Sequence, residues 1–174
     1  ATQIIFKIMQ TSFMPAIGIG QACATLVGKY LGEENSNKAE LSIYESLRGS
    51  LYIMGVMGLI FIIFSESIVS IFIKDISVIK LAAPGLKFIG FLQFIDAFCF
   101  TLWFALTGAG DTRIPAIFDI LNHWLVFVPL CYFLGIYCGY GYWGAWVSFG
   151  IMLLFIAIFM FWRFKTGKWK SIVV

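Results

Sequence analysis

The chain has 174 residues, of which 61% belong to the hydrophobic set AVILMFWYC, only 12% are charged, and the net charge is +3. Its mean hydropathy is +0.94. A soluble globular domain carries about 25% charged residues, so this composition excludes a soluble enzyme domain, a disordered segment and a disulfide-rich secreted module. The sequence predicts an all-α, polytopic helical membrane protein.

Five membrane-spanning helices are predicted from the uncharged stretches. A helix rises 1.5 Å per residue, so about 20 apolar residues cross a hydrocarbon core of about 30 Å. Residues 120–162 form a run of 43 without Asp, Glu, Lys or Arg, which is long enough for two spans. Glycines and aromatic residues at 135–144 mark the point where this run folds back. The predicted helices lie near 5–29, 46–73, 82–109, 114–136 and 143–163.

The basic residues predict a cytoplasmic C-terminus. With this orientation eight basic residues lie inside and four outside, which agrees with the positive-inside rule. The inside residues are Lys29, Lys38, Arg48, Arg113, Arg163, Lys165, Lys168 and Lys170, and the outside residues are Lys7, Lys74, Lys80 and Lys87. The basic residues are too few and too terminal for nucleic-acid binding. Because residue 1 then lies outside, with neither a start methionine nor a signal peptide, we expect the C-terminal part of a longer transporter-like protein.

Asp96 is the leading candidate for a functional residue. It lies nine residues after Lys87 and fifteen before Asp111, which places it deep within its helix. An aspartate inside a membrane is costly and faces a cavity or a partner. Gln93, Phe100 and Trp103 follow the same helical stripe, and a carboxylate beside aromatic rings suits an organic cation. The alternative is that Asp96 hydrogen-bonds a neighbouring helix while the rings face lipid.

Asp119 and His123 form a second polar pair, one turn apart on the fourth predicted helix. Asp119 lies close to the start of that helix, where the helix dipole favours a carboxylate. His123 lies deeper, where it is placed either to relay a proton or to make a structural hydrogen bond. No P-loop, HExxH or nucleophile-elbow motif occurs in the sequence, so no catalytic residue is predicted and the chain is not expected to be an enzyme.

Four runs of residues resemble the multidrug and toxic compound extrusion (MATE) transporters. The run PAIGIGQACATLVGKYLG at 15–32 is similar to the second helix of a half of these proteins. The run ALTGAGDTRIP at 105–115 resembles their cytoplasmic turn between the fourth and fifth helices of a half. The runs WLVFVPL at 124–130 and GYWGAW at 141–146 resemble the fifth helix and the start of the sixth.

This resemblance implies that residues 1–174 are helices eight to twelve of a twelve-helix, two-lobed transporter in the inner (plasma) membrane. It implies export of organic cations and drugs in exchange for Na⁺ or H⁺ by alternating access, with no other cofactor. Asp96, in the Gln-x-x-Asp pattern that starts at Gln93, takes the position of the coupling-ion aspartate, which binds the metal ion where sodium is used. Gln93, Phe100, Trp103, Asp119 and His123 are candidates for the substrate cavity.

The partners expected on this basis are the lipid bilayer, small organic cations and the missing N-terminal lobe of the same protein, with no nucleic acid. Two alternatives remain open. A flippase for lipid-linked precursors shares the broad architecture, although a more basic cavity is expected there. A membrane assembly subunit without transport of its own is the other alternative.

Overall fold

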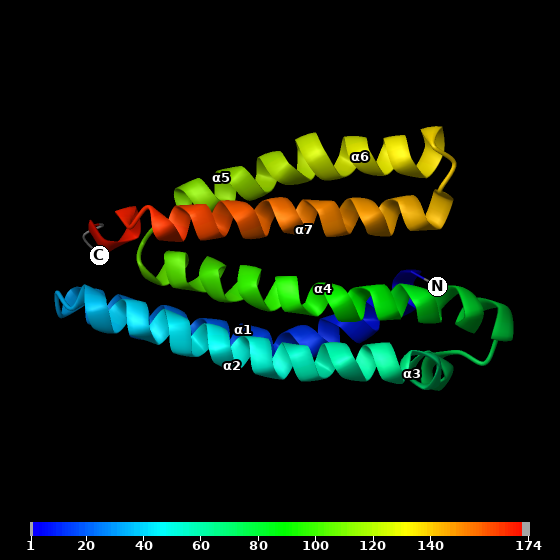
Figure 1. The fold of residues 1–174 in the computed structure, drawn as a ribbon, viewed down its shortest axis with the longest axis horizontal. Helices are drawn as coiled ribbons and strands as arrows, with labels where there is room; N and C mark the ends of the chain where they lie inside the picture. The colour runs from blue at the N-terminus through cyan, green and yellow to red at the C-terminus, as the bar shows by residue number, and fades with distance from the viewer. Residues whose placement is uncertain (1, 172–174) are drawn as a thin grey trace.

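A computed structural model describes residues 2–171, and none of these residues lies in a β-strand. The chain folds into an elongated bundle of long, roughly aligned helices (Figure 1). The long helices are α1 (Thr2–Gly32), α2 (Ser36–Ile63), α4 (Ile76–Gly108) and α7 (Gly141–Lys165). A short helix, α3 (Ser65–Phe72), connects α2 to α4. A 3₁₀ turn at Lys168–Ser171 follows α7.

One further helical rod runs from Arg113 to Tyr137 and changes its winding along its length. It consists of α5 (Arg113–Asn122), a π-helical turn (His123–Phe127), α6 (Val128–Tyr132) and a second π-helical turn (Phe133–Tyr137). Pro129 lies between the two wide turns. Proline has no N–H for the helical ladder, and local π adjustments are one way in which membrane helices accommodate it.

The second helix was predicted at 46–73, and both of its bounds were wrong. It begins at Ser36, because the Asn35 side chain caps its first turn by accepting a hydrogen bond from the Lys38 N–H (3.1 Å). The charged residues at 38–48 therefore lie on a helix that extends beyond the apolar stretch. The helix ends at Ile63, and Phe64, whose backbone is not helical, separates it from α3.

The third helix was predicted at 82–109, and it starts six residues earlier. Asp75 caps this helix by accepting hydrogen bonds from the N–H (2.9 Å) and the hydroxyl (2.5 Å) of Ser77. Pro84 lies inside the helix and does not begin it. The other three helices differ by at most three residues at each end from the predictions 5–29, 114–136 and 143–163.

Four of the described helical segments are long and apolar enough to cross a membrane, namely Ser36–Ile63, Ile76–Gly108, Arg113–Tyr137 and Gly141–Lys165. Helix α1, which the sequence predicted as a fifth span, is not among these four, because Gln, Ser, Thr, Gly and Lys residues interrupt its apolar stretch. It nevertheless packs along both α2 and α4.

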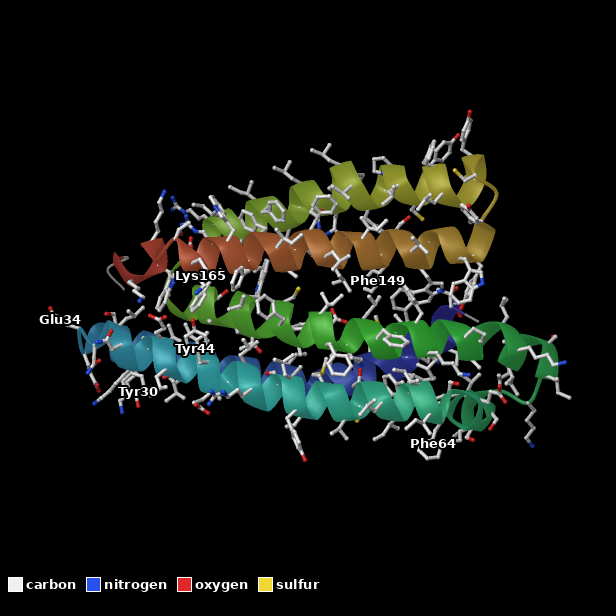
Figure 2. All side chains as sticks on the ribbon, in the orientation of Figure 1. Tyr30, Glu34, Tyr44, Phe64, Phe149 and Lys165 are labelled. Carbon is white, nitrogen blue, oxygen red and sulfur yellow. The ribbon has the colours of Figure 1, made fainter. Side chains whose placement is uncertain are left out.

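Helix α4 is the centre of the bundle. It packs against α1 and α2 on one side and against α7 on the other, and α7 separates it from the 113–137 rod (Figure 1). Backbones approach closely where small residues meet: a β-carbon at Gly58 would lie 2.5 Å from the Gly90 carbonyl oxygen. Such contacts are typical of helix packing in membranes. Figure 2 shows Glu34 and Phe64 at opposite ends of α2.

The outside of the bundle is apolar. Large side chains at mid-helix positions are exposed, including Leu125, Leu154 and Ile158. Water does not tolerate a contiguous surface of this kind, whereas lipid does. The chain is therefore an all-α, multi-pass membrane protein.

Candidate functional site

A cleft of about 320 Å³ lies between the central helix α4 and the pair formed by α7 and the 113–137 rod. Its walls are mostly apolar and aromatic, with polar groups from two helices. The lining residues are Phe13, Asp96, Cys99, Phe100, Trp103, Phe104, Asp119, His123, Phe149, Met152, Leu153 and Ile156. Apolar walls with a few convergent polar groups are typical of ligand sites.

Asp96 is the most deeply placed acid of this cleft. Its side chain is buried, with 3% of the residue exposed. The Oδ2 atom has no hydrogen-bond partner among residues 2–171, and no described cation forms an ion pair with it. An ionised carboxylate in such a place is costly unless a proton or a cation neutralises it. The predicted alternative, a hydrogen bond from Asp96 to a neighbouring helix, is not formed by Oδ2.

Two aromatic residues of α4, Phe100 and Trp103, line the same cleft as Asp96. Phe13 of α1 packs against Phe100, with ring centroids 5.1 Å apart. Phe149 closes the side formed by α7, and Figure 2 shows it on that helix. A carboxylate therefore lies among aromatic rings contributed by three helices.

Gln93 does not line this cleft, which corrects its place on the predicted stripe. Its side chain is completely buried and turns toward α1, where its Nε2 donates a hydrogen bond to Ser12 Oγ (2.6 Å). The Ser12 hydroxyl in turn donates to the Met9 carbonyl (2.7 Å). Gln93 lies only three residues before Asp96, about one helical turn away. At this position α4 faces α1, whereas at Asp96 it faces the cleft. Its contact is an interhelical one.

Asp119 and His123 lie on the opposite wall from Asp96. His123 Nδ1 is 2.9 Å from the Asp119 carbonyl oxygen and 3.4 Å from its carboxylate Oδ1. Both side chains are partly exposed, at 47% for His123 and 33% for Asp119. Between them Asn122 is buried and donates from Nδ2 to the Met152 carbonyl of α7 (3.1 Å). This bond ties the outer rod to α7 beside the cleft.

The sequence did not indicate a buried ion pair at one end of the bundle. Arg163 Nε donates to Asp111 Oδ2 at 2.6 Å, and both side chains are almost completely buried. Asp111 follows α4 and Arg163 lies in the last turns of α7. Single residues such as Phe13 and Met152, which line the cleft from other helices, were also missed. Spacing along the sequence does not give the register between helices. The only sign of a buried pair in the sequence was the single acid, Asp111, in the turn after α4.

No group of three or more His, Cys, Asp or Glu side chains able to hold a metal ion occurs within residues 2–171. For a sodium ion the cleft offers the Asp96 carboxylate and, on the facing wall, the Asp119 carboxylate. A carboxylate with aromatic surroundings, as at Asp96, is a combination that suits an organic cation.

The MatE family model matches residues 1–133. The chain is 31% identical over 169 residues to a probable multidrug resistance protein NorM of Thermotoga maritima, covering 97% of this chain and 36% of that protein. It is 28% identical to the multidrug resistance protein NorM of Burkholderia vietnamiensis, covering 94% of this chain and 37% of that protein. It is 26% identical to the uncharacterized transporter YisQ of Bacillus subtilis, covering 87% of this chain and 33% of that protein.

A solved structure described as the inward-facing conformation of a multidrug resistance MATE family transporter of the MOP superfamily has the same fold. The TM-score is 0.83 at 19% identity, and the match covers 98% of this chain and 40% of the solved one. The chain thus spans little more than a third of the length of the curated relatives that it matches.

Proposed function

The chain belongs to the MatE family, and from that premise we propose that the protein containing it is a secondary antiporter that exports organic cations in exchange for Na⁺ or H⁺. One observation carries the proposal: the buried Asp96 carboxylate, without a hydrogen-bond partner for Oδ2 among the described residues, lies in an aromatic cleft. The printed names of relatives as multidrug resistance proteins support an exported drug as substrate. The chain is not an enzyme.

The position of the chain within the transporter follows from its length and likeness. We propose that it forms helices eight to twelve, most of the C-terminal lobe, and that the rest of the protein supplies the other lobe. We propose the inner membrane on the likeness to the family, and the distribution of lysine and arginine supports a cytoplasmic C-terminus. In this orientation the C-terminal ends of α1, α4 and α7 face the cytoplasm, and the turn at residues 109–112 lies there as well.

The geometry suggests how binding and coupling share one carboxylate. In its ionised form Asp96 attracts a cation, and the faces of Phe100 and Trp103 add cation–π attraction in a site with little water. A proton or Na⁺ that neutralises the carboxylate removes the charge that holds the substrate, so the cation is released. If the two lobes rock between outward-facing and inward-facing arrangements, this competition couples export to ion entry. We propose that Asp119 and His123, which line the facing wall of the cleft, pass protons to and from it.

The test is ethidium efflux by the full-length protein in a drug-sensitive bacterium that lacks its own pumps. We expect Asp96→Asn to abolish efflux at matched membrane expression, because the amide cannot ionise. Glu66→Gln is the matched control, since Glu66 is an exposed acid on α3, and its efflux should equal that of the wild type. Loss of efflux on removing sodium identifies Na⁺ as the coupling ion, and loss on adding an uncoupler in sodium-free medium identifies H⁺. Unchanged efflux in Asp96→Asn would refute the role of this carboxylate.

A further inference from the structure

A second, smaller cavity lies at the end of the bundle where α1 and α7 begin (Figure 1). Its volume is about 170 Å³. Since liquid water takes about 30 Å³ per molecule, this space equals roughly five or six waters. The lining residues are Thr2, Phe6, Phe127, Tyr142, Ala145, Trp146 and Phe149. Five of these seven residues are aromatic, and they come from α1, α7 and the first π-helical turn.

The rings form a connected set around Trp146. Phe6 lies 5.6 Å from the Trp146 ring, Tyr142 6.1 Å and Phe149 6.3 Å, and Phe127 lies 6.4 Å from Phe149. The last three contacts are steep, with interplanar angles of 69°, 89° and 79°. In an edge contact the edge of one ring lies against the face of the other, so each such contact covers one ring face and not two. The cavity is therefore walled by upright rings from three segments and not by a closed stack.

The chemistry of the lining selects the kind of guest. No lining residue is charged, and the polar side-chain groups are the hydroxyls of Thr2 and Tyr142 and the indole N–H of Trp146, which only donates. The Tyr142 hydroxyl lies against α4, where a β-carbon at Gly85 would be 2.5 Å from it, so Tyr142 offers mainly its ring. A primary ammonium group needs acceptors for three N–H donors and finds few here. A quaternary ammonium group has no N–H to satisfy, and aromatic cages are its usual receptor.

We infer that Phe6, Phe127, Tyr142, Trp146 and Phe149 form an aromatic cage for a small quaternary ammonium group. Phe149 lines both this cage and the Asp96 cleft, so the two sites share one wall. The cage admits a trimethylammonium group and is too small for a cation as large as tetraphenylphosphonium. Its role as a stop on the export route rests on the proposed function, whereas its binding chemistry stands apart from transport.

The experiment measures equilibrium binding of radiolabelled choline to the full-length protein in phosphatidylglycerol nanodiscs. Trp146→Leu removes the central ring, and we expect the affinity for choline to fall about five- to thirtyfold. Phe6→Leu is a second variant at a residue that is 43% exposed, where folding is not endangered, and it should weaken binding by a smaller factor. Trp143→Leu is the matched control: Trp143 does not line the cavity, and its ring packs against Phe88 and against Tyr142, so choline affinity should change far less than in Trp146→Leu.

The neutral analogue of choline, in which a carbon atom replaces the nitrogen, separates cation–π attraction from plain apolar packing. We expect it to compete at least fivefold more weakly than choline. Equal competition, no saturable binding of choline, or equal losses in Phe6→Leu and Trp143→Leu would each overturn the cage. Nanodiscs of phosphatidylcholine distinguish two sources of the same group. If a lipid headgroup occupies the cage, choline binds the wild type more weakly there than in phosphatidylglycerol, and this difference between the two lipids disappears in Trp146→Leu. Equal choline binding in the two lipids identifies a free solute.

The choline-binding experiment and the ethidium-efflux experiment can fail independently of each other. Choline binding to the cage requires no transport and no ionised Asp96. The Asp96→Asn variant, whose cleft no longer attracts cations, should therefore keep the saturable choline binding that depends on Trp146. Failure of the cage with efflux still dependent on Asp96 overturns only the cage. Intact cage binding with efflux independent of Asp96 overturns only the proposed coupling site.

Discussion

Removing one member of the Asp111–Arg163 pair should destabilise the protein more than removing both. The Nε and Oδ2 atoms are 2.6 Å apart, and the side chains are only 8% (Arg163) and 4% (Asp111) exposed. A charge left in such a place without its partner costs about 3–5 kcal/mol, whereas apolar replacement of both members is often neutral. Each single variant, Asp111→Leu or Arg163→Met, should therefore raise the unfolding constant at least a hundredfold, by roughly 3 kcal/mol or more.

The assay is reversible unfolding of the full-length protein in mixed micelles, for the two single variants and the double variant. We expect the double variant to recover most of the loss, which gives a large coupling energy. The pair Glu45–Arg48 is the matched control: it has the same chemistry at 2.9 Å, but its side chains are 58% and 77% exposed. Arg48→Met should change stability by less than about 1 kcal/mol. Single variants at 111 and 163 that cost no more than this, with additive effects, would refute the reasoning.

Two further predictions concern packing and capping. Gly58→Ala should cost about 1–3 kcal/mol in the same unfolding assay, because its β-carbon would lie 2.5 Å from the Gly90 carbonyl and overpack the α2–α4 contact; Gly49→Ala, with open space on the same helix, should cost nothing, and equal losses would contradict the prediction. Hydrogen bonds from the Ser77 hydroxyl and N–H lower the pKa of Asp75 below its ordinary 3.8. The cap therefore stabilises the first turn of α4 fully above pH 3.8 and loses this effect as the pH falls through the lowered pKa. The protection factor of the amides in that turn, which corrects for the intrinsic pH dependence of exchange, should fall at acid pH in the wild type but less in an Asp75→Ala variant. Identical protection at every pH in the two proteins would contradict the prediction.

The position of Asp96 along its helix could be predicted from the sequence, because it depends only on residue counts. Charged residues bound the apolar stretches, and a fixed rise per residue places Asp96 far from both ends of its helix. Helix ends were predicted less well. Lys38 lies on a helix that extends beyond the apolar stretch. A charged residue in such a place marks the end of the apolar stretch and not the end of the helix. The caps at Asn35 and Asp75 set these ends.

The direction that a side chain faces could not be predicted in the same way. Gln93 and Asp96 share one face of an ideal helix, yet Gln93 contacts Ser12 while Asp96 lines the cleft. Which neighbour a residue meets depends on the crossing of helices, and that depends on close approaches such as Gly58 with Gly90. Asp119 and His123 line the same cleft as Asp96 because their helix packs on α7 and α7 packs on α4. Residue spacing within one helix does not contain this register between helices.

The two walls of the Asp96 cleft differ in how firmly this chain holds them. In the most apolar stretch of α4, 61% of the residues are buried, against 6% in the 113–137 rod. The wall with Asp96, Phe100 and Trp103 is therefore part of the packed core, while the wall with Asp119 and His123 lies along α7 and includes two π-helical turns around Pro129. A cation bound to Asp96, as proposed, would be held by the more densely packed wall. A change in the width of the cleft requires the less packed rod to move, and the hydrogen bond from Asn122 to Met152 is one of the few polar ties that such a movement breaks.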